Sequence, residues 1–207
     1  MKYRLADLSD VKKLASIHLK ITRKQAAGSM YKFGLCYFRV YYKILLKEKN
    51  RIILVAEDEN GLIYGFTSGT LTAEEHLAAM KKNQLILAVA LIPAVIRYPE
   101  IIKELIGRKK YIYISNNTVQ YSITSGPRVD YWGWLYTNKH LSIPLFKAWL
   151  KIAFERGASS VKGDIYAEDD NLINIQKYNG ARIVDEVVCH DGRKRIIIEF
   201  VSENARI

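Results

Sequence analysis

The sequence predicts an α/β domain with a mixed central sheet. Two observations predict this class. Extended segments alternate with amphipathic helical segments in the second half of the chain, and two pairs of neighbouring extended segments, at 51–71 and 181–201, have the form of hairpins. The chain has 207 residues, 49% of them hydrophobic, which is enough for one sizeable core. We therefore expect a single domain over 1–207, with an inserted helical segment at about 73–110.

The first half is expected to alternate between short strands and amphipathic helices. The helices are recognised by apolar residues at helical spacing, and the hairpin by an acidic turn, Glu59-Asn60-Gly61, between two β-branched runs. In order, the elements are a strand at 2–6, a helix capped by Ser9 or Asp10, a helix after Gly28-Ser29, strands at 51–58 and 62–71, and the helical segment at 73–110.

The second half follows a similar pattern. A clear amphipathic helix at 141–156 has Pro144 in its first turn, where proline is tolerated, and ends at Gly157. The remaining expected elements are extended stretches at 110–115 and 118–125, a strand at 128–136, a strand at 159–167, a helix at 171–178 and a closing hairpin of 181–189 and 193–201.

Composition excludes several classes of protein. A disordered chain would be poorer in apolar residues, and a disulfide scaffold would need more cysteines than Cys36 and Cys189. Two distant cysteines and an N-terminus without an apolar signal core favour a cytoplasmic protein. The longest apolar run, Leu85 to Ile96, is too short to cross a bilayer as a helix, and Pro93 is expected to interrupt it.

Three stretches resemble the GNAT superfamily of N-acetyltransferases. YRLADLSDVKKLASIH resembles that family's first strand and helix, RIILVAEDENGLIYGFTSG its second and third strands, and NLINIQKYNGARIVDEV its penultimate helix and the turn after it. The order of elements agrees as well. The resemblance implies a mixed, mostly antiparallel sheet flanked by helices, with the 73–110 insertion between the third and fourth strands.

The resemblance also implies a function, transfer of an acetyl group from acetyl-CoA, as co-substrate, to a primary amine of a small molecule or peptide. In that fold the pantetheine arm lies between the splayed fourth and fifth strands, here 128–136 and 161–167, and the pyrophosphate lies at the start of the next helix. The residues that match these positions are Trp134, Leu135, Tyr136, Asn138, Lys139, His140, Leu141 and Ser142.

The loop before that helix departs from the family's pattern, Q/R-x-x-G-x-G/A. It contains no glycine, and Ser142 stands where the last small residue is expected. Lys139 and His140 either replace the lost backbone contacts with charge or are solvated loop residues. An alternative function is therefore a GNAT-like binding or interaction module that has lost catalysis.

The resemblance also directs attention to catalytic residues. Asp130 is the first candidate for the general base, with Glu57 and Asp164 in reserve. The family's acid tyrosine would stand four residues before Gly180, but Gln176 occupies that position. Tyr178 and Tyr166 are then the candidates for protonating the thiolate, and packed aromatic side chains are the alternative for both.

Other kinds of site find no support in the sequence. The four histidines and two cysteines show no metal-ligand spacing, so no metal is expected. The basic run Arg193-Lys194-Arg195 is short and opens a strand, so nucleic acid is not an expected partner.

The formal net charge of +11 is concentrated in the first quarter of the chain. Residues 1–50 hold 12 basic and 3 acidic side chains, and the insertion holds 7 and 4. This distribution favours an anionic acceptor or an anionic surface, with solvated helix faces as the alternative. For residues 83–110, the apolar and basic residues suggest peripheral membrane contact, a homodimer surface, a lid over the acceptor or a helical cover of the core.

Overall fold

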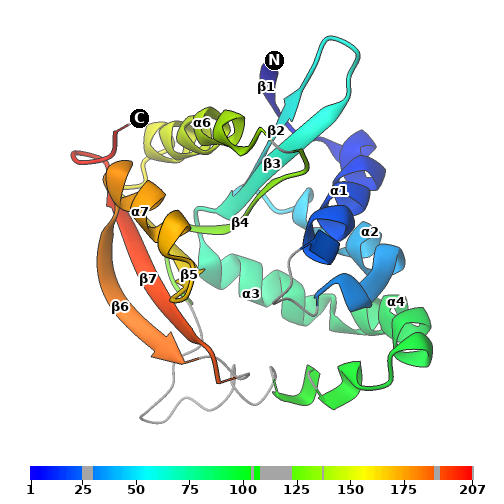
Figure 1. The fold of residues 1–207 in the computed structure, drawn as a ribbon. Coiled ribbons are helices and arrows are strands. Elements are labelled where there is room, and N and C mark those ends of the chain that lie inside the picture. Colours follow the sequence, from blue (N-terminus) through cyan, green and yellow to red (C-terminus); the bar gives the residue numbers. More distant parts are fainter. Residues whose placement is uncertain (25–29, 104, 108–122, 137, 189–191, 207) are drawn as a thin grey trace.

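The computed structural model describes the chain except for residues 25–29, 104, 108–122, 137, 189–191 and 207. Its described residues form one seven-stranded sheet in the order β1-β2-β3-β4-β5-β7-β6 (Figure 1). The strands are β1 (Lys2–Leu5), β2 (Arg51–Glu57), β3 (Ile63–Thr70), β4 (Arg128–Trp134), β5 (Ser160–Tyr166), β6 (Arg182–Val188) and β7 (Lys194–Val201).

All neighbouring strands pair antiparallel except β4 and β5, which are parallel. The two predicted hairpins are β2–β3 and β6–β7. The mixed, mostly antiparallel sheet is therefore confirmed. In the first hairpin, Asp58 organises the turn, because its Oδ1 accepts hydrogen bonds from the backbone N–H of both Asn60 and Leu62.

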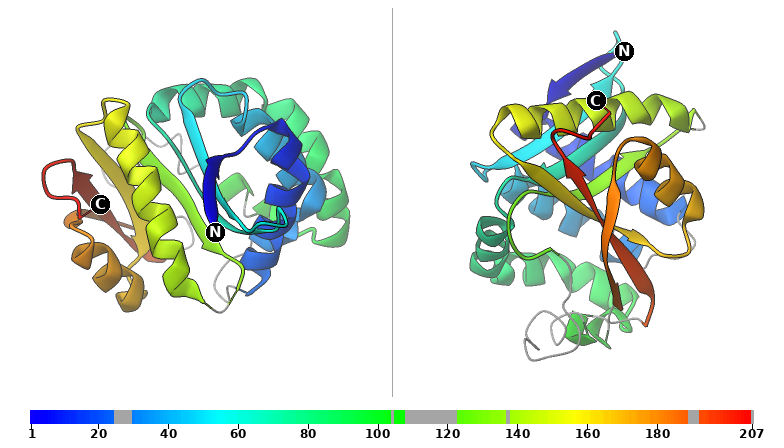
Figure 2. Two further views of the ribbon diagram at one scale, coloured as in Figure 1. Left: turned by 90° about the horizontal axis from the view of Figure 1, so that it is seen from above. Right: turned by 90° about the vertical axis from the view of Figure 1, so that its left-hand side faces the viewer.

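Helices cover both faces of this sheet. The α-helices with described bounds are α1 (Val11–Lys24), α2 (Gly34–Leu45), α3 (Ala73–Lys82), α4 (Gln84–Arg97), α6 (Ser142–Glu155) and α7 (Asp170–Tyr178), and residues 101–103 and 105–107 are helical too. Since α3 and α4 follow β3 and precede β4, the predicted helical insertion is confirmed. The views of Figure 2 show α6 on the opposite side of the sheet from α1 and α2.

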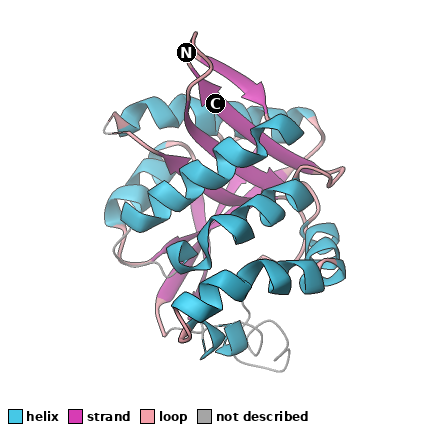
Figure 3. Ribbon diagram, turned by 90° about the vertical axis from the view of Figure 1, so that its right-hand side faces the viewer, coloured by secondary structure: helices cyan, strands magenta, loops and turns pink. Residues whose placement is uncertain are grey.

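Alternation along β2 divides the core into two layers. Ile52 and Leu54 pack with α6 and α7, whereas Ile53 and Val55 pack with α1 and α2. The insertion packs differently from these helices, through an apolar cluster of its own. A third apolar cluster joins α4 to Phe33 and Ile101, so the insertion extends the helical layer seen in Figure 3.

Two glycines explain local features of this packing. A Cβ on Gly69 would lie 2.3 Å from the ring of Trp149 and 2.4 Å from the carbonyl oxygen of Arg128, so only glycine lets α6 approach β3 this closely. Gly180 ends α7 at φ +97°, where its Cα faces the backbone of Asn204.

Some local expectations need correction. Asp7, not Ser9 or Asp10, caps the first helical turn, and Asp10 completes a capping box by accepting the Asp7 N–H. Pro93 lies inside α4 without ending it, and the bend falls instead at Asn83, between α3 and α4. The expected extended stretches at 110–115 and 118–125 fall almost entirely outside the described residues.

Candidate functional site

The strands β4 and β5 touch at only one end. Their parallel register, over 128–134 and 160–166, contains the pair Arg128↔Lys162, and the N–H of Lys162 donates to the carbonyl of Pro127 at 3.0 Å. Beyond that pair the strands diverge. A cavity of about 600 Å³ lies beside the far end of β4, lined by residues from α1, β4, α6 and α7. The expected splay of the fourth and fifth strands is therefore present.

The start of α6 forms one wall of the cavity. The indole Nε1 of Trp132 donates to the carbonyl of Ser142 at 3.2 Å, which ties β4 to this helix. The first turn of α6, residues 142–145, contains no acidic residue. Among the described residues, no side-chain hydrogen bond caps this helix. By contrast, Asp169 caps α7 and accepts the N–H of Leu172. A helix start without a carboxylate favours an external anion.

The predicted cofactor residues divide into two groups. Those lining the cavity are Trp134, Leu135, Tyr136, His140 and Ser142. Asn138 and Leu141 are exposed and do not line it, and the side chain of Lys139 lies outside the described part of the chain. Trp134 is 9% exposed, and its Nε1 is buried without a hydrogen-bond partner among the described residues.

The first candidate base, Asp130, does not reach the cavity. A bulge in β4 aligns Tyr131 with Ser68 and Val129 with Gly69, which leaves Asp130 as the extra residue. Its carboxylate forms ion pairs with Arg51 and Arg128. Burial alone would raise the pKa of Asp130, but the two guanidinium groups outweigh it and hold the pKa below its usual value. This geometry disfavours proton abstraction by Asp130.

The Asp130 carboxylate belongs to a larger buried ionic cluster. Arg51, 8% exposed, also pairs with Glu48 at 2.9 Å. His76 Nδ1 lies 3.0 Å from Glu48 Oε1. The cluster joins β2, β4 and α3 at the end of β4 opposite the cavity, so its charges are compensated within the chain.

The reserve carboxylates are also paired. Glu57 pairs with Arg4 at 2.7 Å, a hydrogen-bonded contact that lowers the pKa of Glu57. Asp164 pairs with Arg195. Neither lines the cavity.

The two candidate tyrosines lie away from the cavity as well. Tyr178 is 73% exposed and stacks under Arg206. The hydroxyl of Tyr166 accepts hydrogen bonds from Arg193 and Arg195. Gln176, at the position where the family has tyrosine, is buried. The tyrosine among the described cavity-lining residues is Tyr136. Its ring centroid lies 4.7 Å from that of Tyr64.

Several cavity residues were not expected from the sequence. Lys24, in the last turn of α1, donates from Nζ to the carbonyl of Leu135 at 3.2 Å. The sequence Asp169-Asp170-Asn171 at the start of α7 is a readable capping signal, but nothing local places it beside β4. The unexpected lining residues are Ile21, Lys24, Trp132, Gly133, Ile143, Asp169, Asn171, Leu172 and Ile175.

The cavity therefore combines an apolar wall with a few polar side chains. Lys24 supplies a cation, Asp169 a carboxylate and His140 an imidazole. No described residue of the insertion lines it. Among the residues that the structure describes, no group of three or more His, Cys, Asp or Glu side chains could hold a metal ion.

The fold is similar to those of several solved structures. No family model and no curated sequence matches the chain, but solved structures do. A ribosomal-protein-alanine N-acetyltransferase from Brucella melitensis aligns with a TM-score of 0.60 and 12% identity, over 97% of this chain and 99% of that one. PaiA N-acetyltransferase from Thermoplasma acidophilum, in complex with coenzyme A, gives 0.56 and 12%, over 97% and 99%.

A third similar structure, a Vibrio cholerae spermidine N-acetyltransferase chimera, gives a TM-score of 0.60 and 8% identity, over 98% of this chain and 95% of that one. At these identities the likeness shows the fold alone. The chain thus has the GNAT N-acetyltransferase fold, as the sequence predicted.

Proposed function

We propose that the chain transfers an acetyl group from acetyl-CoA to a primary amine. The observation that carries this proposal is the cavity of about 600 Å³ at the place where β4 and β5 diverge, beside the start of α6. The fold alone would not suffice, because one fold serves many functions. Here the cavity, the divergent strands and a helix start whose first turn has no acidic residue coincide.

Two features support binding of acetyl-CoA. The edge of β4 that faces β5 is unpaired beyond Arg128, so its backbone groups can pair with the amides of a pantetheine arm as an added strand would. The start of α6 can hold the pyrophosphate through backbone N–H groups and the helix dipole. Trp134, Leu135, Tyr136, His140 and Ser142 would line the bound molecule, with Asn138, Lys139 and Leu141 at its entrance.

The transfer needs a proton acceptor and a proton donor. The acceptor nitrogen, once deprotonated, attacks the thioester carbonyl carbon; the C–S bond breaks, an amide forms and the thiolate takes a proton. His140 and Asp169 line the cavity and can accept the amine's proton. The Tyr136 hydroxyl can protonate the sulfur. This assignment replaces Asp130 and Tyr178, which the structure directs elsewhere.

The charge near the cavity supports an acceptor that carries a carboxylate or a phosphate beside its amine. Lys24 lines the cavity, and Lys20 and Arg23 are exposed on the same end of α1. Such cations attract an anionic group and raise its local concentration. The remaining partner predictions, membrane contact and a homodimer, concern the surface of α4 rather than this cavity.

The test combines binding and turnover. Acetyl-CoA is expected to raise the melting temperature, and thiol release is expected with primary amines, fastest for those that also carry a carboxylate or phosphate. Tyr136→Phe should lower kcat about tenfold or more while the acetyl-CoA thermal shift stays unchanged. Tyr178→Phe is the matched control, because Tyr178 is 73% exposed and outside the cavity, and it should leave kcat unchanged.

The possible failures distinguish the alternatives. No thermal shift at millimolar acetyl-CoA would remove the proposal altogether. A thermal shift without thiol release from any amine would instead assign the chain to the class of binding modules that keep the fold and lack the chemistry.

A further inference from the structure

Helix α4 is apolar on all sides, yet only one side is covered. Its inner face buries Leu87, Leu91 and Ala94, and Leu91 and Ala94 pack with Phe33 and Ile101. Its outer face leaves large aliphatic side chains in solvent, and two isoleucines in the next helical residues along the chain are exposed too. The exposed set is Leu85 (76%), Ile86 (57%), Val89 (64%), Ile92 (52%), Ile96 (79%), Ile102 (46%) and Ile106 (52%).

We name these seven side chains the outer apolar face. A helix that is apolar all round is usually buried, so one side of α4 lacks a partner. Isolated exposed aliphatic residues need no explanation, but a contiguous set marks an interaction surface. Helix α4 itself lies at the lower right edge of the molecule in Figure 1.

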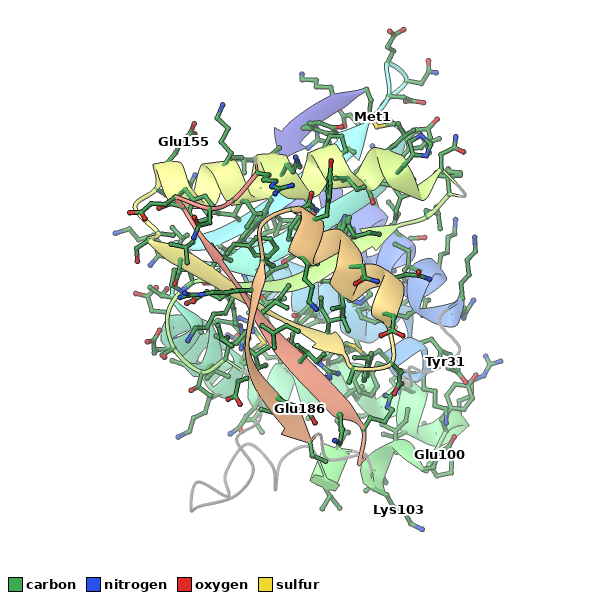
Figure 4. The ribbon with its side chains drawn as sticks, turned by 60° about the vertical axis from the view of Figure 1, so that its left-hand side comes forward. Met1, Tyr31, Glu100, Lys103, Glu155 and Glu186 are labelled. Atoms are coloured by element: carbon green, nitrogen blue, oxygen red, sulfur yellow. The ribbon has the colours of Figure 1, made fainter. Side chains whose placement is uncertain are left out.

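The charge around this face is predominantly positive. Lys81 and Lys82 end α3, Arg97 ends α4, and Lys103 follows; all are exposed. None of the four forms an ion pair with another described residue. The nearby carboxylate of Glu100 is paired with Lys32 at 2.8 Å. Figure 4 shows Glu100 and Lys103 at the lower edge of the molecule, pointing away from the sheet.

We infer that the outer apolar face docks on an anionic lipid surface. Aliphatic side chains flanked by lysine and arginine suit the boundary between headgroups and acyl chains. A second copy of the chain fits less well, because it would bring an equally basic rim, on a chain of net charge +11, against this one. The charge complementarity therefore selects lipid over self-association. This inference is independent of the proposed acetyl transfer.

In this proposal α4 rests in the interface with its outer face toward the acyl chains. No single described helix is long and apolar enough to span a membrane. The 14 residues of α4 extend about 21 Å, against a hydrocarbon core of roughly 30 Å. The pair α3 and α4 is bent by 68°, and the inner face of α4 remains committed to Phe33 and Ile101. Only the outer face is available to lipid.

Vesicle sedimentation of the full chain tests the inference. Pelleting is expected with vesicles of phosphatidylcholine plus phosphatidylglycerol, at least tenfold less with phosphatidylcholine alone, and less as sodium chloride is added. The double variant Leu85→Gln and Ile96→Gln should reduce pelleting on anionic vesicles at least tenfold. Lys81→Gln with Lys82→Gln should reduce it about tenfold as well.

A matched control uses two exposed leucines elsewhere, Leu8 (53%) and Leu62 (48%). Leu8→Gln with Leu62→Gln should pellet as the parent chain does. Because all substituted residues are exposed, the melting temperatures of the variants should equal that of the parent chain. An unchanged melting temperature shows that a variant has lost binding and not folding. Either of two results would overturn the inference: no pelleting on anionic vesicles, or a dimer in sedimentation equilibrium that the α4 double variant dissociates.

Discussion

The two ends of β4 differ in how their polar groups are used. At its first residues, β4 pairs with β5, and Arg128 and Asp130 join the buried ionic cluster with Arg51. At its last residues, β4 leaves β5 and lines a cavity with Trp134. Charges at the first end compensate one another within the chain. Polar groups at the second end remain available to a ligand.

A single bulge separates these two ends. Val129 packs with the α6 layer, whereas Tyr131 packs with the α1 and α2 layer and Asp130 reaches Arg51. A carboxylate on the correct strand is therefore not enough to make a general base. Its side chain must also face the cavity and lack a cation that neutralises it.

The largest expected effect comes from breaking the first end. Asp130→Ala leaves Arg51, 8% exposed, without its main counter-charge, so we expect a loss of about 3–5 kcal/mol in unfolding free energy. Urea denaturation measures it. Glu155→Ala, which removes an exposed carboxylate 4.0 Å from Lys151, should change stability by less than about 0.5 kcal/mol. Equal effects of the two substitutions would show that the ionic cluster does not stabilise the fold.

An intermediate effect is expected from the middle of the strand, where Tyr131 covers His18. Their ring centroids are 4.1 Å apart, and His18 Nδ1 lies 2.6 Å from the Tyr42 hydroxyl. Burial lowers the pKa of His18 to about 3, from 6.5. Between these values only the unfolded chain takes up the proton, so this residue makes the folded state less stable as pH falls below about 6.5.

The predicted slope is about 1.4 kcal/mol per pH unit from His18 alone, or about 2–3 kcal/mol between pH 6.5 and 4.5. Urea denaturation at each pH measures it. His18→Gln should remove that part of the slope, whatever it does to stability at pH 7. Should the variant not fold, an NMR titration of His18 in the parent chain decides. A His18 that titrates near pH 6.5 would contradict the prediction.

At the cavity end of β4 we expect the smallest effect on stability and a clear effect on acetyl-CoA binding. Leu141→Asp places a negative charge at the start of α6, where the pyrophosphate is proposed to bind. Helix stability should stay unchanged or rise by up to about 1 kcal/mol, because carboxylates suit helix N-termini. Affinity for acetyl-CoA should fall at least tenfold. Leu141→Asn is the control, because asparagine has almost the same shape as aspartate without the charge, and it should keep most of the affinity for acetyl-CoA. Equal acetyl-CoA affinities of the two variants would argue against an anion site at the start of α6.

Much of the fold was predictable because it follows from periodicity. The hairpins, the amphipathic α6 and the helical segment after β3 all show in the order of apolar residues. Strand β4 was harder. Its bulge shifts the alternation by one residue, which period-two reasoning cannot detect. Asp130 was expected at the site because its position resembles that of a family carboxylate, and the resemblance does not reveal which way its side chain points.

The cavity was predictable in position but not in membership. The stretch Trp134–Ser142 was expected there, and most of its described side chains line it. On α7 the inward position belongs to Gln176, and Tyr178, two residues later, is rotated by about 200° toward solvent. Lys24 and Asp169 reach the cavity through tertiary packing between elements far apart in the sequence, which no local pattern encodes.

The single register pair between β4 and β5 also has a mechanical consequence. It divides the sheet into two leaves, β1–β4 and β5–β7, with almost no backbone ladder between them. Helix α6 fastens both: Trp149 donates to the carbonyl of Ile52 in one leaf, and Phe146 packs on Phe200 in the other, ring centroids 5.5 Å apart. A force pulling the leaves apart would be resisted by side-chain contacts of α6. A ligand that bridges the gap between β4 and β5 would stiffen the molecule where the sheet has the fewest backbone hydrogen bonds between neighbouring strands.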